Sequence, residues 1–246
     1  MIIGSKIIFR ENLPSTNTYA SQILRNIELK EGTIIYTNYQ SAGRGYAGNG
    51  WESEDGKNLL FSVLLFPAVV NPTDQFIISI AVSLGITDFL ERYIPVCRVK
   101  WPNDIYVNSD KIAGILIENS IMGNILENSV AGIGLNVNQD KFLSSAPNPV
   151  SMKIITGTDY DLKDSLTKLA SDLDRRYKQV LSEKFSQLRE DYTTKLFRLN
   201  EWAGFRDGTG VFTGRILSVS ENGRLQVETK SGSINEYSFK EIEFII

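Results

Sequence analysis

The chain has 246 residues, of which 42% are hydrophobic and 22% charged, as expected for a soluble folded protein with one large domain or one domain plus a small appendage. It contains no histidine and a single cysteine, Cys97, which excludes Ser-His-Asp and Cys-His catalysis, histidine-ligated zinc and intrachain disulfides. The formal net charge of −3 is opposite to the positive charge expected of a protein that binds DNA or RNA.

Neither a targeting signal nor a membrane span is predicted. Residues 1–13 lack the sustained apolar run of a secretory signal, and the longest uncharged apolar stretch, residues 58–73, is interrupted by Pro67, Asn71 and Pro72. A transmembrane helix needs about 20 apolar residues. Together with the single cysteine, this predicts a cytoplasmic protein with no membrane partner.

The first part of the chain alternates between strand and helix patterns. Strands are expected at residues 2–9, 32–39, 58–66, 96–107, 112–118 and 129–137, and helices at residues 18–27 and 73–93. No repeat of fixed period is present, which argues against solenoid and propeller folds.

The pattern changes after residues 147–149. A short helix is expected at 151–156, one long helix or a helical pair at 162–197, and strands at 210–219, 224–229 and 236–244. The Asn222-Gly223 pair between two alternating runs predicts a hairpin. The chain is therefore expected to be α+β, with a catalytic-size domain at residues 1–205 and a small β domain at 206–246.

Residues 43–48 (GRGYAG) match the GxGxxG pattern. The match does not fit a dinucleotide-binding or phosphate-binding loop, because Asn49, Gly50 and Trp51 follow instead of a helix or a Lys-Ser/Thr pair. Two interpretations stay open. The segment is either a surface loop whose glycines permit positive φ, or a loop that closes over a ligand, and the arginine and the aromatic residue within it favour the second.

Short neutral polar side chains flank the strands that lead to this segment: Ser15, Thr16 and Asn17 before it, and Gln40 beside it. They suit an uncharged amide-like or ureido group of a ligand, since a buried polar group without a partner costs about 1–3 kcal/mol. Each also has a structural interpretation, as a helix N-cap for Ser15 or Thr16 and as a turn residue for Gln40.

A charged block lies further along the chain, where KWPND (100–104) is followed by KIAGILIE (111–118). A hairpin between the two motifs is expected to bring Asp104 near Lys111. Lys111 could then reach a cleft as a fixed positive charge, or it could be an ordinary lysine at a strand end with its charge in solvent. Gly114, inside an apolar strand, predicts a close approach to the backbone.

Taken in order and spacing, the motifs STN, YQSAGRG, KWPND, KIAGILIE and GIGLNVN resemble the catalytic domain of biotin protein ligases, closely over residues 15–138 and more loosely over the rest. The resemblance implies a mixed, mostly antiparallel sheet with flanking helices, as in class II aminoacyl-tRNA synthetases, followed by an SH3-like β domain. It also implies a ligase that uses ATP and Mg²⁺ to convert biotin to biotinyl-5′-AMP, and that then transfers biotin to a lysine of a biotin carboxyl carrier protein domain.

The resemblance further implies residue roles. The biotin site would comprise Ser15, Thr16, Asn17, Gln40, Gly43, Arg44, Gly45, Lys111 and Gly114. The nucleotide site would comprise Arg44, Gly48, Trp51, Asn103, Lys111 and Asn136, with Trp51 packed on adenine. Lys111, Asp104 and Arg44 would act in catalysis, and the metal ligands are left unassigned.

The chain departs from the family pattern at two places. Tyr46 stands where many members carry a second arginine, which removes one charge that could pair with phosphate and predicts weaker retention of the activated intermediate. Ile2 opens the catalytic fold directly, so no DNA-binding domain and no operator binding are expected. The alternatives are a lipoate or octanoate ligase-type acyltransferase and a non-catalytic biotin-binding protein, and a homodimer is compatible with each.

Overall fold

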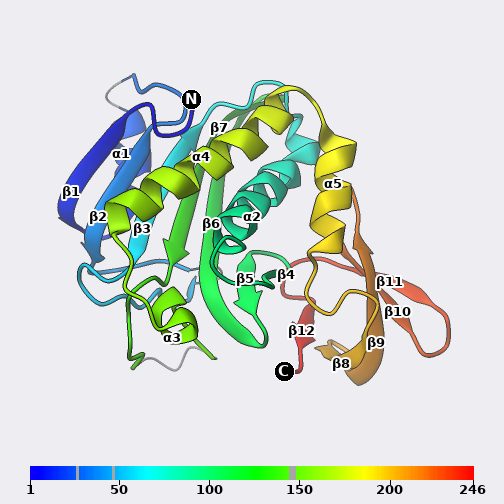
Figure 1. The fold of residues 1–246 in the computed structure, drawn as a ribbon. Coiled ribbons are helices and arrows are strands. Elements are labelled where there is room, and N and C mark those ends of the chain that lie inside the picture. The colour runs from blue at the N-terminus through cyan, green and yellow to red at the C-terminus, as the bar shows by residue number, and fades with distance from the viewer. Residues whose placement is uncertain (26–27, 46–47, 144–147) are drawn as a thin grey trace.

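The computed structural model describes residues 1–25, 28–45, 48–143 and 148–246, which form two β-sheets and several helices (Figure 1). The larger sheet has the strand order β1-β2-β3-β7-β6-β5-β4. Its strands are β1 (Ile7–Leu13), β2 (Ile34–Gln40), β3 (Leu59–Leu65), β4 (Arg98–Lys100), β5 (Asp104–Val107), β6 (Asp110–Met122) and β7 (Ile125–Leu135). Only β1 and β2 pair in parallel, so the expected mixed, mostly antiparallel sheet is confirmed.

Helices cover both faces of this sheet, which explains why β3 is apolar at every position but one. Ile34 and Val63 face α2 (Phe76–Leu90) and α4 (Leu162–Leu181), whereas Ile35 and Leu64 face α1 (Thr16–Leu24). Successive side chains of a strand point to opposite faces, so a strand buried on both sides loses its polar alternation. Ser62 is the one polar residue of β3, and it lies on the α1 face beside Thr16.

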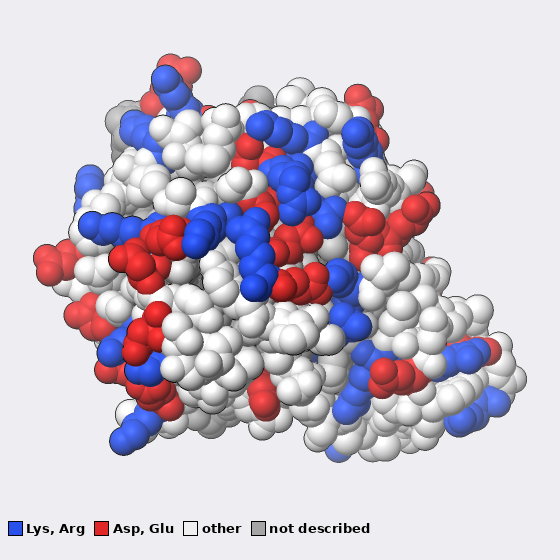
Figure 2. Space-filling view, in the orientation of Figure 1, with Lys and Arg blue, Asp and Glu red and all other residues white. Residues whose placement is uncertain are grey.

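The helical layer on the other face consists of α2, α4 and α5 (Phe185–Thr194), and α3 (Met152–Thr156) lies apart from it. Figure 2 shows interspersed charges of both signs on this side of the molecule. Ion pairs join the helices, since Arg176 contacts both Asp88 of α2 and Asp191 of α5. Residues 162–197 are thus a helical pair, with a break at Glu183, where φ is 53°.

Helix α2 is the one described stretch that is long and apolar enough to cross a membrane by length and composition alone. The stretch is Pro72–Leu90, and 72% of its most apolar window is buried inside the protein. It begins as a 3-10 turn at Pro72–Asp74 and continues as α2, which ends at Leu90, three residues before the expected end. Burial between the sheet and α4 accounts for its apolar surface on all sides.

The second sheet is antiparallel, with the strand order β11-β10-β9-β8-β12. Its strands are β8 (Trp202–Asp207), β9 (Gly210–Val219), β10 (Leu225–Thr229), β11 (Ile234–Tyr237) and β12 (Ile242–Phe244). The Asn222-Gly223 hairpin turn is confirmed, and Gly223 has a φ of 87°. The predicted boundary between residues 205 and 206 falls inside β8, and the division of the chain into two domains stays a prediction.

This second sheet packs directly on the end of the larger one that carries β4 and β5. The Trp101 indole donates a hydrogen bond to the Gly223 carbonyl at 2.9 Å, and the Phe239 ring lies 5.1 Å from the Trp101 ring and 6.1 Å from the Phe76 ring. One hydrophobic cluster runs from α2 into the second sheet. These contacts hold the turn between β4 and β5, which leads to Asp104, against the second sheet.

Five strand predictions were wrong in their extent, and two of them, 112–118 and 129–137, were too short at their adjoining ends, where β6 and β7 form one long hairpin. The first strand is β1, because the Asp174 carboxylate binds the amides of Ile2 and Ile3 and ties that segment to α4 instead. Residues 96–107 form two strands, β4 and β5, since Pro102 lies in the turn between them and has no N–H to donate. Residues 236–244 likewise divide between β11 and β12.

Gly85 lies where α2 crosses α4, and a Cβ there would lie 2.8 Å from Leu173 Cδ2 and 3.0 Å from Leu173 Cα. We expect Gly85→Ala to lower the free energy of unfolding by up to about 2 kcal/mol, because an overpacking cost of about 1–3 kcal/mol outweighs the roughly 1 kcal/mol that alanine gains over glycine in a helix. Denaturant titration measures the change. Ser171→Ala, on the exposed face of α4, is the control and should not destabilise. A Gly85→Ala protein as stable as the wild type would contradict this packing argument.

Candidate active site

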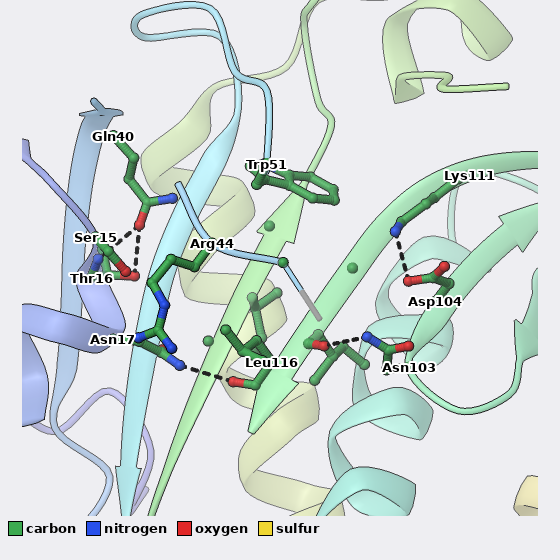
Figure 3. Close-up of a pocket in the computed structure, with 16 residues that line it drawn as sticks. Ser15, Thr16, Asn17, Gln40, Arg44, Trp51, Asn103, Asp104, Lys111 and Leu116 are labelled. Carbon is green, nitrogen blue, oxygen red and sulfur yellow. Dashed lines mark hydrogen bonds and ion pairs between the residues drawn. The ribbon is translucent and has the colours of Figure 1, made fainter. Parts of the chain in front are cut away.

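One pocket collects most of the predicted site residues, on the face of the larger sheet that carries α1 (Figure 3). It holds about 440 Å³ of empty space including its open mouth, a size that suits a small organic ligand. The predicted residues that line it are Ser15, Thr16, Asn17, Gln40, Arg44, Gly45, Trp51, Asn103, Asp104, Lys111 and Gly114. The other lining residues are Ile115, Leu116, Gly132, Ile133 and Gly134.

At one end of the pocket, Thr16 and Gln40 present neutral polar groups. The Gln40 side-chain oxygen accepts hydrogen bonds from the Thr16 backbone N–H at 2.8 Å and from the Thr16 hydroxyl at 3.2 Å. These bonds join the end of β2 to the start of α1 and turn the Gln40 amide nitrogen toward the pocket (Figure 3). Ser15 is the N-cap of α1, and its hydroxyl accepts from the Thr18 N–H at 3.5 Å while it also lines the pocket. The expected cap and the expected ligand donor are thus the same residue.

Asn17 belongs to the wall of the pocket, but its amide is bound to the protein. Its nitrogen donates to the Leu116 carbonyl at 3.0 Å and to the Glu118 carboxylate at 2.9 Å, and its oxygen accepts from the Ser62 hydroxyl at 2.6 Å. With both sides of the amide bonded, Asn17 holds α1 on the sheet and has no polar atom left for a ligand. Asn17 therefore supports the wall of the pocket. Its assignment to the biotin site stays a prediction.

The floor of the pocket consists of glycines on neighbouring strands. A Cβ on Gly132 would lie 2.3 Å from Asn17 Oδ1, and Cβ atoms on Gly134 and Gly114 would lie 2.4 and 2.8 Å from the Trp51 ring. The close approach expected at Gly114 is confirmed, and the approaching group is the Trp51 indole. Real Cβ atoms do not come this near to other heavy atoms, so only glycine leaves room for Trp51 and Asn17 here.

The other end of the pocket is charged. The Lys111 ammonium lies 2.7 Å from the Asp104 carboxylate, as the hairpin spacing predicts, and 5.6 Å from the centre of the Trp51 ring. Lys111 and Asp104 are only 25% and 18% exposed, so their charges are partly shielded from water. Asn103 is held beside them by a hydrogen bond from its amide nitrogen to the Ile115 carbonyl at 2.8 Å.

The glycine segment, which we define as residues 43–45 and 48–51, forms a narrow loop over the pocket. The Gly45 N–H donates to the Asn49 carbonyl at 2.7 Å, and the Trp51 N–H donates to the Gly43 carbonyl at 2.9 Å. Gly43 lies at the base of the loop, where a Cβ would meet the Trp51 carbonyl at 2.6 Å, and Gly48 has open space around it. Tyr46 lies outside the described residues.

Two predicted site residues have partners that differ from the expectation. Arg44 lies at the α1 side of the pocket, where its guanidinium pairs with Glu118 at 2.7 Å, and not beside Lys111 (Figure 3). Asn136 does not line the pocket, because its amide nitrogen donates to the Val150 carbonyl at 3.0 Å. Its buried side-chain oxygen has no partner among the described residues.

Besides the unpredicted lining residues, sequence reasoning assigned no role to three residues that lie behind the pocket wall. Ser62 and Glu118 hold Asn17, and Lys100 places its ammonium 5.2 Å from the Tyr106 ring and 5.1 Å from the Phe244 ring. Burial lowers the pKa of Lys100, and the neighbouring charge of Lys111 lowers it further. The available signal was the single polar residue inside β3 and the charged residues of the KWPND and KIAGILIE motifs, Lys100 and Glu118.

Comparison with known proteins identifies the family. Residues 9–136, more than half of the chain, match the Biotin/lipoate A/B protein ligase family. The Bacillus spizizenii bifunctional ligase/repressor BirA is 26% identical over 242 residues, which cover 96% of this chain and 74% of that protein. The biotin–[acetyl-CoA-carboxylase] ligase of Paracoccus denitrificans is 28% identical over 235 residues, which cover 89% and 92%.

A solved structure agrees with these sequence matches. The biotin protein ligase from Aquifex aeolicus, in complex with biotin and ATP, superposes with a TM-score of 0.80 and 27% identity, over 97% of this chain and 98% of that one. The chain belongs to the biotin/lipoate A/B protein ligase family. The resemblance indicated by the motifs and the α+β fold class are thereby confirmed.

Cys97 directly precedes β4 and is fully buried in the hydrophobic core, and burial raises its pKa to about 12. Because the thiolate is the reactive form, the protonated thiol should be inert in the native protein. We expect a disulfide reagent such as DTNB, at mildly alkaline pH, to leave Cys97 unmodified in the native protein and to modify it fully in denaturant. Rapid modification of the native protein would show instead that the thiol is accessible and ionised.

Proposed function

We propose that the protein is a biotin–protein ligase. It activates biotin with ATP to biotinyl-5′-AMP and transfers the biotinyl group to a lysine of a biotin carboxyl carrier protein domain. The observation that carries this proposal is the polarity of one pocket, with the neutral groups of Thr16 and Gln40 at one end and the Lys111 ammonium at the other. Biotin has a matching polarity, because it carries an uncharged ureido ring and a carboxylate at the end of a chain.

In the first step the ureido ring binds to the Ser15, Thr16 and Gln40 end, and the carboxylate extends over the glycine floor toward Lys111. A carboxylate oxygen attacks the α-phosphorus of ATP and pyrophosphate leaves. The Lys111 ammonium offsets the repulsion between the two anions and stabilises the negative charge that develops on the phosphorus oxygens. The glycine segment with Gly43, Arg44 and Gly45 excludes water from the anhydride that forms.

The nucleotide occupies the Trp51 side of the pocket. We assign the adenine to the Trp51 ring, the phosphates to Lys111 and Asn103, and supporting positions to Asn136 and Gly48. Mg²⁺ would neutralise phosphate charge. Among the described residues no group of three or more His, Cys, Asp or Glu side chains is placed to hold a metal ion. The oxygens of Asp104 and Asn103 suit Mg²⁺, which commonly takes one or two protein oxygens and completes its shell with phosphate and water.

In the second step the amine of the carrier lysine attacks the acyl carbon of biotinyl-5′-AMP. A C–N bond forms, the C–O bond to the phosphate breaks, and AMP leaves. The attacking amine has to lose a proton, and Asp104 is the carboxylate at this end of the pocket, so we assign it as the group that orients the amine and accepts the proton. No covalent enzyme intermediate is needed.

Incubation with ATP, labelled biotin and a carrier domain tests the whole proposal, since label should appear on the carrier lysine. The family also includes lipoate ligases, and the acid that drives exchange of pyrophosphate into ATP separates the two activities. We expect biotin, and neither lipoate nor octanoate, to drive the exchange. Biotin binding without exchange would indicate the non-catalytic alternative.

The role of Lys111 predicts a specific loss. Lys111→Met keeps the apolar stem but removes the charge, and we expect ATP–pyrophosphate exchange to fall at least about a hundredfold, as when a preorganised stabilising donor is lost. Lys195→Met is a matched control, because Lys195 is also 25% exposed and paired with a carboxylate, that of Glu91. Near-normal exchange in Lys111→Met would remove Lys111 from the reaction.

The role of Asp104 predicts that the two half-reactions separate. Asp104→Asn keeps the shape of the side chain, so adenylate formation should survive while transfer to the carrier falls about a hundredfold, in the range of a general base. The two rates are measured as pyrophosphate release and as label on the carrier. Equal losses in both would show that Asp104 acts in adenylate formation, by holding Lys111 or Mg²⁺, and not as the base of the transfer step.

A further inference from the structure

Glu118 ends the KIAGILIE motif, and its carboxylate lies at the meeting point of two parts of the pocket. One oxygen accepts from Arg44 Nη2 at 2.7 Å, and the other accepts from Asn17 Nδ2 at 2.9 Å and lies 3.4 Å from Arg44 Nη1. Arg44 belongs to the glycine segment and Asn17 to α1. Glu118 thus joins the loop over the pocket to the helix at its neutral end.

The Asn17 side of this contact is rigid. The Asn17 side chain is bonded at both ends, is only 3% exposed, and rests on the backbone of Gly132. Glu118 lies on the same face of β6 as Gly114 and Leu116, because residues two apart on a strand share a face. Its carboxylate is therefore oriented before Arg44 arrives, so that less side-chain entropy is lost on pairing than in an ordinary surface ion pair.

Arg44 links this contact to the glycine segment, to which it belongs. Arg44 forms an isolated bridge with Gly50, so the two limbs of the loop are paired where the side chain leaves them. The guanidinium and the carboxylate face each other with two nitrogens toward two oxygens, the geometry that gives charge-assisted hydrogen bonds their strength. A displacement of Arg44 from Glu118 would move the loop away from the pocket wall.

We propose that Glu118 is a positioning residue of the biotin site, which acts through Arg44 to hold the glycine segment over the pocket and so slows the release of bound biotin. This inference rests on the proposed function. In the opposite case, Glu118 would keep Arg44 away from the ligand, and removal of the Glu118 carboxylate would tighten biotin binding.

The test is the rate at which labelled biotin leaves the enzyme without ATP, measured by chase with unlabelled biotin. Glu118→Gln keeps an oxygen that accepts from Asn17 but removes the charge that pairs with Arg44. We expect Glu118→Gln and Arg44→Met each to speed release about tenfold, as charge-assisted hydrogen bonds are about twice as strong as neutral ones. Because both variants remove the same contact, the double variant should release biotin no faster than the faster of the two single variants.

Glu228→Gln is the matched control, because Glu228 also pairs with an arginine, Arg215, but in the second sheet away from the pocket. It should leave biotin release unchanged. In steady state, Glu118→Gln should raise KM for biotin more than it lowers kcat. Release at the wild-type rate, slower release, or additive effects in the double variant would overturn the proposal.

Hydrogen exchange in the free protein gives a second readout, which does not depend on biotin. Glu118→Gln should speed exchange of the Gly45 and Trp51 amides about tenfold, since both amides are protected by bonds within the loop, and should leave the amides of β6 and β7 unchanged. Unchanged exchange at Gly45 and Trp51, or faster exchange throughout both strands, would overturn the proposed positioning role. If the wild type bound no biotin, the proposed function would fail, and this exchange experiment would still test the contact itself.

Discussion

The pocket depends on the absence of side chains at three positions of the central strands. Gly132 allows the Asn17 amide to lie on the sheet, and Gly114 and Gly134, which are paired across β6 and β7, allow the Trp51 ring to do the same. Glycine is unfavourable inside strands, because it loses more backbone entropy and has no side chain to pack. Here the space it leaves is filled by the two side chains that build opposite walls of the pocket.

The two ends of the pocket suit different chemical groups of a ligand. A ligand that reaches Thr16 and Gln40 has to offer neutral donors and acceptors, since unpaired polar groups are costly when water is excluded. At the other end, Lys111 and Asp104 already form a pair, and a second anion can enter only if it shares the ammonium. The arrangement favours a molecule with a neutral polar head and an acidic tail over one that is charged at both ends.

Features that depend on short-range sequence patterns were predicted correctly. Contacts between residues far apart in the chain were not predicted. The apolar run of β3, the hairpin at Asn222-Gly223 and the pairing of Asp104 with Lys111 follow from short-range patterns. The partner of Arg44 lies 74 residues away, and the serine that fixes Asn17 lies 45 residues away. Strand β8 was missed for a related reason, since its residues become a strand only by pairing with β9 and β12.

The second sheet also takes part in the charge balance of the pocket. Lys100 is paired with Asp104 across β4 and β5, so both side chains lie on the face that carries Lys111. Phe244 of β12 places its ring 5.1 Å from the Lys100 ammonium, and burial is the largest cause that lowers the pKa of Lys100. Asp104 opposes this shift, because its negative charge favours the charged amine. The carboxylate is thus placed between two lysines, and the strand that sets the surroundings of one of them comes from the second sheet.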